Sequence, residues 1–341
     1  MKVAMVGISG AVGTTLLELF ARHAADDIDL SLYGSARSAG ETRLYKGQSL
    51  RVREFRREAL ADQDVIFLCV SGDFAQAHAR SLAKHSLVID NSSAFRRADD
   101  VPLLMPRING SGYRGEKLLA NPNCSSAIAL MALAPLETHV GLEHVQLSTY
   151  QAASGAGAPA MAELKAKLGA FTAYGEDDRS DFFHYNLAYN VIPHIDAFCE
   201  NGYTKEEMKA VWELRKILGR PDLAVAATCV RVPTLRSHAE ALSVKLRHPV
   251  TLSEVRQWWR QMPGLSLVDN FADNRPAYPM PLSSSLLYDV EVGRLRHSLI
   301  YGSRGLDFFV SGDQLLRGAA LNAYEIFCLT QGLSLPAEYG R

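Results

Sequence analysis

The chain has 341 residues, 48% hydrophobic and 21% charged, a composition typical of globular proteins that excludes disorder as the main state. Its 36 Lys and Arg against 37 Asp and Glu give a net charge of -1, so it lacks the basic field of a nucleic-acid or membrane-surface protein. The longest uncharged apolar run, residues 127–136, is too short to cross a bilayer. Five scattered cysteines lack the spacing of a disulfide framework or a zinc site, so we expect a reduced cytoplasmic protein without metal.

Short apolar strands alternate with amphipathic helices over the first third of the chain, as in a parallel α/β sheet. The strands are expected at residues 2–6, 30–33, 64–70 and 87–90, and the helices at residues 14–23 and about 74–84. This pattern predicts a Rossmann-type domain over residues 1–123.

Longer alternating strands follow residue 124 and are typical of a mixed or antiparallel sheet. We expect strands at residues 145–150, 224–232, 241–247, 289–295 and 306–310, and helices at residues 204–218 and 252–262. The sequence thus predicts an α+β domain with a mixed sheet over residues 124–312. A closing helix from Asp313 is expected to complete the first domain with residues 313–341.

A glycine-rich turn, Gly7-Ile8-Ser9-Gly10-Ala11-Val12-Gly13, lies between the first expected strand and helix. Gly7 permits a tight turn, Gly10 lets backbone N–H groups approach a pyrophosphate, and Gly13 allows close helix–strand packing. The spacing differs from the usual GxGxxG, so a tight turn without a ligand is the alternative. Its position at the first strand predicts a dinucleotide cofactor.

The end of the second expected strand indicates which dinucleotide is bound. An acidic residue there favours a free ribose 2′-hydroxyl, but the chain offers Ser35-Ala36-Arg37-Ser38, with a cation and hydroxyls. These groups suit a 2′-phosphate and predict NADP. The alternative is a solvated arginine in a loop.

A candidate nucleophile, Cys124, follows Asn121-Pro122-Asn123 and opens an apolar helix. The helix dipole stabilises a thiolate at such a terminus, which is what a nucleophile requires. The alternative is that Cys124 is a small core residue, as we expect for the other four cysteines.

Two further motifs are candidates for binding a cofactor or substrate and for proton transfer. The small residues after Gln151, including Ser154 and Gly155, let another group approach the backbone closely, as a nicotinamide would require, although a plain glycine turn would look the same. Arg231 can grip a carboxylate or phosphate, and His238 after it can move protons near neutral pH. A single histidine is more often structural, which is the alternative for His238.

Together, and in this order, these motifs resemble the aspartate-β-semialdehyde dehydrogenase family over nearly the whole chain. The similar stretches are residues 7–13, 35–40, 90–96, 122–125, 148–151, 154–157, 206–209, 229–233 with His238, 292–294 and 318–322. The resemblance implies NADPH-dependent reductive dephosphorylation of L-aspartyl-4-phosphate to L-aspartate 4-semialdehyde. That reaction belongs to the aspartate pathway to lysine, threonine, methionine and diaminopimelate, and the family implies a homodimer formed through the second, catalytic domain.

The resemblance also implies a role for each matching residue. Cys124 matches the nucleophile, His238 the general acid/base and Gln151 the residue that orients the acyl intermediate. The substrate would meet Arg231 through its α-carboxylate, Arg96 and Lys209 through its phosphate, Glu206 through its amino group, and Asn123 beside the nucleophile. The cofactor would meet Gly7, Gly10, Ala11, Val12, Gly13, Ser35, Arg37, Ser38, Ser71, Ser154, Gly155 and Gln314. For Glu206 and Lys209 a solvated i,i+3 helix pair is the alternative.

The chain departs from the family pattern in places, including Arg107, where the family often has an acid, and Val70-Ser71-Gly72. One alternative function is a related acyl-phosphate reductase, such as one acting on N-acetylglutamyl phosphate. A second is a non-catalytic NADP-binding paralogue, which loss of Cys124 or His238 would mark, and both are present. A thiol hydrolase would not need the glycine-rich turn.

Overall fold

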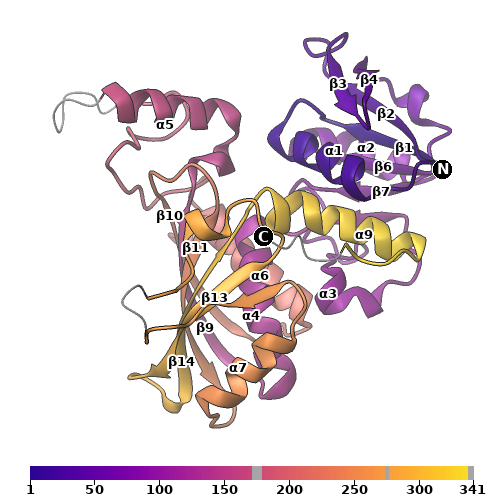
Figure 1. The fold of residues 1–341 in the computed structure, drawn as a ribbon. Helices are drawn as coiled ribbons and strands as arrows, with labels where there is room; N and C mark the ends of the chain where they lie inside the picture. Colours follow the sequence, from indigo (N-terminus) through magenta and orange to yellow (C-terminus); the bar gives the residue numbers. More distant parts are fainter. Residues whose placement is uncertain (171–178, 273–275, 337–341) are drawn as a thin grey trace. The chain divides into compact units, whose positions relative to one another are not determined.

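The computed structural model describes residues 1–170, 179–272 and 276–336, which divide into two compact units (Figure 1). The first unit holds residues 1–123 and the described residues from Ala319 onward, and the second holds residues 124–318. None of the helices in the described ranges is both long enough and apolar enough to span a membrane.

A parallel six-stranded sheet forms the first unit, in the order β5-β2-β1-β6-β7-β8. Its strands are β1 (Lys2–Val6), β2 (Asp29–Gly34), β5 (Arg53–Glu54), β6 (Val65–Leu68), β7 (Leu87–Asp90) and β8 (Leu118–Ala120), and a separate hairpin pairs β3 (Thr42–Tyr45) with β4 (Gln48–Arg51). Every residue of β6 and β7 is buried. Such continuous burial is expected of a parallel sheet that helices cover on both faces.

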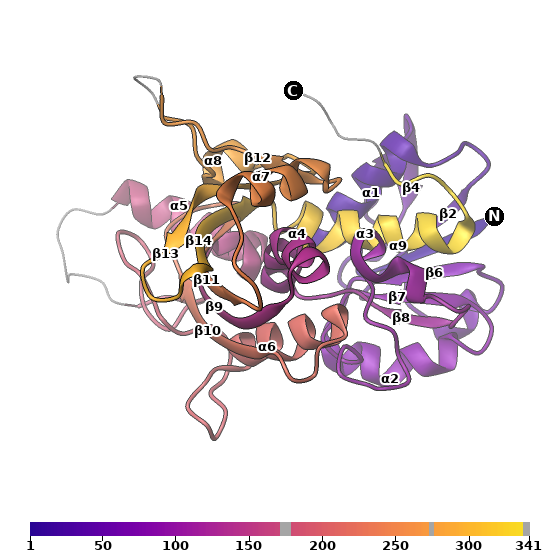
Figure 2. The same cartoon turned by 90° about the horizontal axis from the view of Figure 1, so that it is seen from below.

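The helices of the first unit flank this sheet. They are α1 (Ala11–His23), α2 (Gly72–Leu82), α3 (Pro106–Asn109) and α9 (Leu321–Gln331), with α1 and α9 on one side of the strands and α2 on the other (Figure 2). The Phe20 ring of α1 packs against Tyr324 and Phe327 of α9, with ring centroids 5.0 and 5.2 Å apart. The last helix therefore contributes directly to the core of the first unit.

The expectation that an α-helix starts at Asp313 is wrong, because α9 begins at Leu321 after a π-helical turn, Leu316–Ala320. The Asp313 side chain is fully buried and accepts hydrogen bonds from the N–H groups of Leu315 and Leu316. The side chain thus binds the N–H groups that follow the end of β14 at Gly312. Residues 313–318 belong to the second unit.

The unexpected base Arg107 has a structural explanation. Its Nε donates to Glu325 Oε1 at 2.7 Å, and the two side chains are 11% and 0% exposed. A second nitrogen of the same guanidinium, Nη2, donates to the Pro336 carbonyl at 3.2 Å. The departure from the family pattern thus joins α3 to α9 within the first unit through a nearly buried ion pair.

A mixed six-stranded sheet forms the second unit, in the order β10-β9-β11-β14-β13-β12. Its strands are β9 (Leu142–Gln151), β10 (Ala224–Arg231), β11 (His238–Leu246), β12 (Leu265–Leu267), β13 (Val290–Ser298) and β14 (Gly302–Gly312). The pairs β9–β10 and β12–β13 are parallel and the other pairs antiparallel. The predicted fold class, a parallel Rossmann-type sheet followed by an α+β domain with a mixed sheet, is confirmed.

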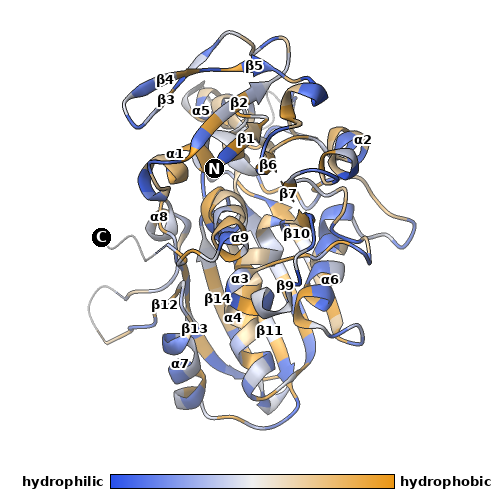
Figure 3. Cartoon of the chain, turned by 90° about the vertical axis from the view of Figure 1, so that its right-hand side faces the viewer, coloured by the Kyte–Doolittle hydropathy of each residue, from blue (hydrophilic) through white to orange (hydrophobic). Residues whose placement is uncertain are grey.

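Three helices pack on one face of the mixed sheet (Figure 1): α4 (Cys124–His139), α6 (Lys205–Leu218) and α7 (Leu252–Gln261). Figure 3 colours α4 mainly hydrophobic and α7 mainly hydrophilic, and residues 125–136 of α4 are all buried. The helix predicted at residues 204–218 is α6, and a capping box starts it, in which Thr204 and Glu207 exchange hydrogen bonds. The described residues of this unit also form the helices α5 (Ala158–Ala170) and α8 (Pro281–Ser284).

Side chains of β9 alternate between the two faces of the mixed sheet, as the two-residue period of a strand requires. Leu147, Thr149 and Gln151 are buried on the helix-covered face. Gln146 and Tyr150 are exposed on the other face. Strand β9 therefore has one buried face, which includes the polar side chains of Thr149 and Gln151, and one face open to solvent.

Candidate active site

Three of the predicted site residues lie in one row across three strands. Arg231 ends β10 and pairs with Gln151, which ends β9. Ala239 of β11 pairs with Tyr150, which places His238 opposite Gln151 in the antiparallel register. The side chains of Arg231, Gln151 and His238 are 7%, 2% and 0% exposed, so the fold brings three polar groups together in a buried position.

The peptide groups of Ala152 hold two members of this row. The Ala152 N–H donates to His238 Nδ1 at 3.0 Å, and the Ala152 carbonyl accepts from Arg231 Nη1 at 2.7 Å. The turn that follows is bound to the opposite loop, because Ala153 N–H donates to the Thr234 carbonyl at 2.9 Å. One short stretch of backbone thus holds both the imidazole and the guanidinium.

Gly155 lies against the same two side chains. A Cβ at this position would come within 2.8 Å of Arg231 Nη1 and 3.3 Å of His238 Nε2. The absence of a side chain at Gly155 therefore makes room for both groups, which fits the predicted need for small residues after Gln151.

His238 has a defined protonation state. Because Nδ1 accepts a hydrogen bond from a backbone N–H, the neutral ring carries its proton on Nε2. Burial, and then the charge of Arg231, lowers the pKa of His238 to about 3. Nε2 is buried and has no hydrogen-bond partner among the described residues. The imidazole therefore presents a neutral N–H donor that is available to a ligand.

Cys124 is the first residue of the 16-residue helix α4, as predicted. A Cβ added to Gly318 would lie 2.7 Å from the Cβ of Cys124, so a glycine is needed to accommodate the cysteine. Burial lowers the pKa of Arg231, and the charges of Glu206, Cys124 and Cys229 partly offset this effect. The thiol therefore lies within electrostatic range of Arg231, at a helix end that favours the thiolate.

A chain of hydrogen bonds fixes the Gln151 amide. Thr149 Oγ1 donates to Gln151 Oε1 at 3.0 Å, and Gln151 Nε2 donates to Glu206 Oε1 at 3.2 Å. The other Glu206 oxygen accepts from Lys209 Nζ at 2.9 Å. Since Glu206 is 6% exposed, the alternative of a solvated Glu206–Lys209 pair does not describe this helix.

Two predicted cofactor residues of the second unit contact each other. Gln314 Nε2 donates to Ser154 Oγ, and Gln314 Oε1 accepts from the Ser237 N–H at 2.8 Å. Ser237 immediately precedes His238 and has a positive φ of 66°. Gln314 thus ties the turn after β9 to the start of β11, a positioning contact that the sequence did not indicate.

The predicted glycine roles in the first unit fit its turn geometry. Gly7 has a φ of 87°, and a Cβ there would lie 2.1 Å from the Cys69 carbonyl oxygen. A Cβ at Gly13 would lie 2.5 Å from the Gly7 oxygen, so helix and strand pack too closely for a side chain. Gly10 precedes α1, and no side chain caps that helix end. Ala11 and Val12 begin the helix, so the turn can receive a phosphate at backbone N–H groups.

The serines expected to bind the cofactor differ in their contacts. Ser35 and Arg37 are exposed just after β2, where a ligand could reach them. Ser38 is 4% exposed, and its hydroxyl donates to the Ser35 carbonyl. Ser71 caps α2 by accepting from the Phe74 N–H at 3.4 Å. Ser38 and Ser71 therefore have structural contacts that the sequence did not predict.

Arg96 lies at the carboxyl ends of β7 and β8, where ligands of parallel sheets bind. It is 8% exposed, and it donates to the carbonyls of Asn121 at 2.7 Å and Asn91 at 3.0 Å. The Asn121 amide in turn donates to Asn91 Oδ1 and accepts from Asn322 Nδ2 at 2.6 Å. Asn123 is also 8% exposed. The sequence did not predict this asparagine network, although Asn91 and Asn121 directly follow β7 and β8, and amides after two neighbouring strands are a usable signal.

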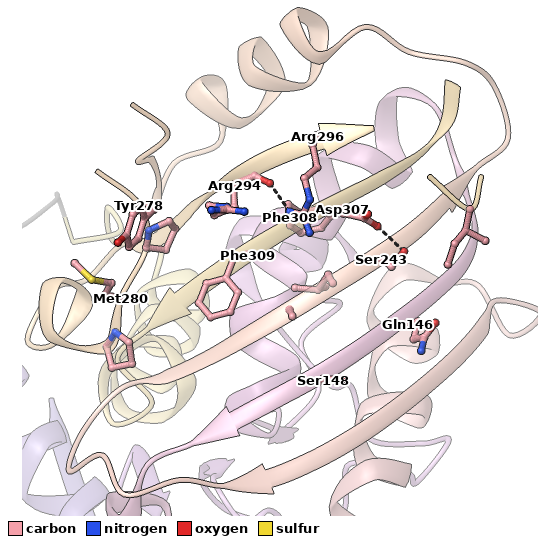
Figure 4. A pocket seen from close by; sticks show the side chains of 15 residues that line it. Gln146, Ser148, Ser243, Tyr278, Met280, Arg294, Arg296, Asp307, Phe308 and Phe309 are labelled. Atoms are coloured by element: carbon pink, nitrogen blue, oxygen red, sulfur yellow. Dashed lines mark hydrogen bonds between the residues drawn. The ribbon is translucent and has the colours of Figure 1, made fainter. Parts of the chain in front are cut away.

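A separate groove of about 710 Å³ lies on the open face of the mixed sheet (Figure 4). Gln146 and Ser148 of β9, Ser243 of β11 and Phe309 of β14 line it, together with Tyr278 and Met280. Because Gln151 and Thr149 point to the other face of β9, this groove is separate from the buried row of Arg231, Gln151 and His238.

Two family models match the chain. One, described as semialdehyde dehydrogenase, NAD binding domain, matches residues 2–115. The other, described as semialdehyde dehydrogenase, dimerisation domain, matches residues 133–317. The two matches together cover most of both units.

Full-length relatives agree with the family models. The chain is 38% identical over 335 residues to an aspartate-semialdehyde dehydrogenase of Bacillus subtilis, with 96% of each chain covered. The corresponding values for the Prochlorococcus marinus enzyme are 37% over 328 residues, with 96% of this chain and 94% of that one covered. The solved structure of Vibrio cholerae aspartate semialdehyde dehydrogenase II complexed with ASA has a TM-score of 0.88 at 35% identity, covering 97% of this chain and 98% of that one.

The protonation state of His238 can be measured directly. In protein labelled with 15N-histidine, we expect one ring with an unprotonated Nδ1 and a protonated Nε2 that does not titrate between pH 8 and about 5, because its lowered pKa keeps it neutral there. A His238→Gln difference spectrum assigns the signal. A His238 ring that titrates near pH 6.5, or that carries its proton on Nδ1, would contradict the assignment.

Proposed function

Because the chain belongs to the aspartate-semialdehyde dehydrogenase family, we propose that it reduces L-aspartyl-4-phosphate to L-aspartate 4-semialdehyde with NADPH, through a thioester on Cys124. The observation that carries this proposal is the Ala152 backbone, which orients Arg231 and His238 in the unit that contains Cys124. In metabolism the reaction would serve the aspartate pathway to lysine, threonine, methionine and diaminopimelate.

The buried polar row suits an amino-acid substrate. Arg231 uses one of its five guanidinium N–H groups on Ala152, and the others can grip the α-carboxylate. Glu206 supplies a buried carboxylate for the amino group. Lys209 and Arg96 are assigned to the phosphate. An N-acetylated substrate has no ammonium for Glu206, and this favours aspartyl phosphate over N-acetylglutamyl phosphate.

Catalysis begins when the Cys124 thiolate attacks the acyl carbon and forms a C–S bond, while the C–O bond to phosphate breaks. The electron pair of that bond leaves with phosphate, which also receives the proton that the overall reaction consumes. NADPH, when bound, supplies a hydride to the thioester carbonyl. Collapse of the resulting thiohemiacetal breaks the C–S bond, releases the aldehyde and restores the thiolate.

His238 stabilises negative charge in this scheme. Its neutral Nε2–H can donate to the carbonyl oxygen as charge develops there, in both the acylation and the reduction step. No proton has to leave the ring for the thiohemiacetal to collapse to aldehyde and thiolate. We therefore assign His238 as a hydrogen-bond donor in its resting state, in place of the general acid/base role expected from the family. Gln151, held by Thr149 and Glu206, is assigned to orient the acyl group.

The first unit fits a dinucleotide, and its features favour NADP. The glycine-rich turn offers an uncapped helix end to the pyrophosphate. Arg37 is exposed after β2, and no acidic residue lies between Leu32 and Ala39 to bind a 2′-hydroxyl. A 2′-phosphate at Arg37 gains charge-assisted hydrogen bonds, each worth about 1.5–3 kcal/mol.

A homodimer formed through the open face of the mixed sheet is part of this proposal. The supporting observations are the match to a dimerisation domain and the groove of about 710 Å³ on that face. Phe309 and Ser148 line the groove and are partly exposed, so a second copy would cover them. All five cysteines are free thiols, which fits the cytoplasm as the site of a thiolate enzyme.

The nucleophile is tested by Cys124→Ser. We expect loss of at least about 99% of turnover, because a hydroxyl lacks the nucleophilicity of a thiolate, while NADP still binds the untouched glycine-rich turn. The assay is phosphate-dependent reduction of NADP with aspartate semialdehyde, run beside N-acetylglutamate semialdehyde. Cys199→Ser, in a loop of the same unit, is the control and should retain full activity. Substantial activity in Cys124→Ser would overturn the thioester route, and preference for the N-acetylated aldehyde would overturn the substrate.

The cofactor proposal predicts that Arg37→Ala weakens NADP binding tenfold or more, since roughly 1.4 kcal/mol corresponds to one decade, and leaves NAD nearly unchanged. Both cofactors are titrated by fluorescence against wild type and variant. The exposed Arg57→Ala in the same unit controls for the loss of one positive charge. Equal losses for NADP and NAD would show that Arg37 contacts a part common to both cofactors.

The dimer is tested by light scattering at micromolar concentration, where we expect the mass of two chains. Ser148→Asp places a charge on the open sheet face and should shift the mass toward the monomer, because a buried unpaired charge is costly. Ser49→Asp on the exposed β4 strand of the first unit is the matched control. A monomeric wild type would contradict the proposal.

A further inference from the structure

The Lys209 ammonium is held by two carboxylates. Its Nζ donates to Glu206 Oε2 at 2.9 Å within α6 and to Asp196 Oδ2 at 2.8 Å in the preceding loop. The lysine side chain is 20% exposed, against 7% for Glu206 and 35% for Asp196. An ammonium has three N–H donors, so these contacts leave one for a ligand.

Backbone contacts fix the position of Asp196. Upstream, Ile192 and Arg231 exchange backbone hydrogen bonds of 2.9 and 2.8 Å. Downstream, the Lys205 N–H donates to the Ala197 carbonyl at 2.8 Å. Asp196 thus lies between the strand that carries Arg231 and the start of the helix that carries Lys209.

Asp196 also has an unusual backbone conformation. Its φ is 69°, in the left-handed region that non-glycine residues seldom adopt, and its Oδ1 accepts from the N–H of Ala197 at 2.8 Å. This conformation costs free energy that the surrounding hydrogen bonds must offset. It directs the second oxygen, Oδ2, to Lys209.

The charge of Lys209 depends on these contacts. Burial lowers the pKa of Lys209, but the nearby Glu206 and Asp196 more than compensate and raise it above its ordinary value. The ammonium stays protonated at neutral pH. Two of its three N–H directions are fixed by carboxylates on different elements, which fixes the third direction as well.

We propose that Asp196 is a positioning residue of the phosphate site, which fixes the Lys209 ammonium so that its remaining N–H meets a phosphate oxygen of the substrate. This inference rests on the proposed function, in which Lys209 binds phosphate. Glu206 alone would leave the ammonium free to rotate about the Cε–Nζ bond and the long side chain free to move.

The direction in which phosphate affinity changes distinguishes positioning of Lys209 from a purely electrostatic effect of the Asp196 charge. A carboxylate near the site repels phosphate, so an electrostatic effect alone predicts tighter phosphate binding when Asp196 is neutralised. Positioning predicts weaker binding.

The test variant is Asp196→Asn. Asparagine tolerates the left-handed conformation and can still accept from the Ala197 N–H, but its amide nitrogen cannot accept from Lys209. We expect the Kd of inorganic phosphate, measured by calorimetry on the intact protein, to rise about tenfold, as loss of one ordered charge-assisted contact implies. The phosphate KM should rise equally, while kcat at saturating phosphate and the KM for aspartate semialdehyde change less than about twofold.

Two comparisons show whether Asp196 acts through Lys209. In a Lys209→Met background, Asp196→Asn should cause no further loss of phosphate affinity, because the group that it positions is absent. Glu200→Gln removes the same charge from an exposed position in the same loop and should leave the phosphate Kd unchanged.

Several results would overturn the positioning role: no phosphate binding by wild type, unchanged or tighter binding in Asp196→Asn, or equal losses in the Lys209→Met background. A general loss of kcat, all KM values and Tm in Asp196→Asn would show a merely structural role and overturn it too. If phosphate binds as expected but drives no oxidation of aspartate semialdehyde, the proposed function fails and the positioning role stands.

Discussion

The second unit depends on the short backbone stretch at Ala152, whose N–H binds His238 Nδ1 and whose carbonyl binds Arg231 Nη1. The two peptide groups that flank the Cα of Ala152 supply one donor and one acceptor, so they can orient a neutral imidazole and a cationic guanidinium together. The contact with the Ala152 N–H sets the His238 tautomer and leaves the proton on the buried Nε2. The proposed role of His238 as a hydrogen-bond donor therefore depends on a backbone group.

The remaining polar groups of the row are buried and connected. Gln151 and Lys209 both donate hydrogen bonds to Glu206, and Lys209 also donates to Asp196. Asp196 lies in a loop whose backbone is hydrogen-bonded to Arg231 at the end of β10. Buried polar groups are costly unless hydrogen-bonded, so each contact offsets part of the cost of burying these groups. Gly155, which lies against two of these side chains, is required because any side chain there would displace them.

Sequence patterns predicted the features that residue type alone determines. The two sheets, the capped helix α6, Cys124 at the start of α4 and the glycine-rich turn all follow from periodicity or from residues with few conformational options. The Ala152 contacts could not be predicted, because backbone donors carry no signature in a sequence. The helix expected from Asp313 starts later, because the buried Asp313 side chain accepts from the N–H groups of Leu315 and Leu316 and a π-helical turn precedes α9.

The most direct test of this account replaces the Ala152 amide by an ester, with lactic acid incorporated at position 152. The change removes the N–H that binds His238 Nδ1 and leaves the Ala152 carbonyl in place for Arg231. The α-hydroxy acid analogue of serine at Ser154, whose N–H binds the Leu235 carbonyl at 3.2 Å, controls for general weakening of the turn and leaves the Ala152 carbonyl an amide. We predict that kcat falls about tenfold or more for the ester at 152 and much less for that at 154, because only the first releases the imidazole. Equal kcat values for the two esters, or a wild-type value at 152, would contradict the claim that this peptide group sets the catalytic histidine.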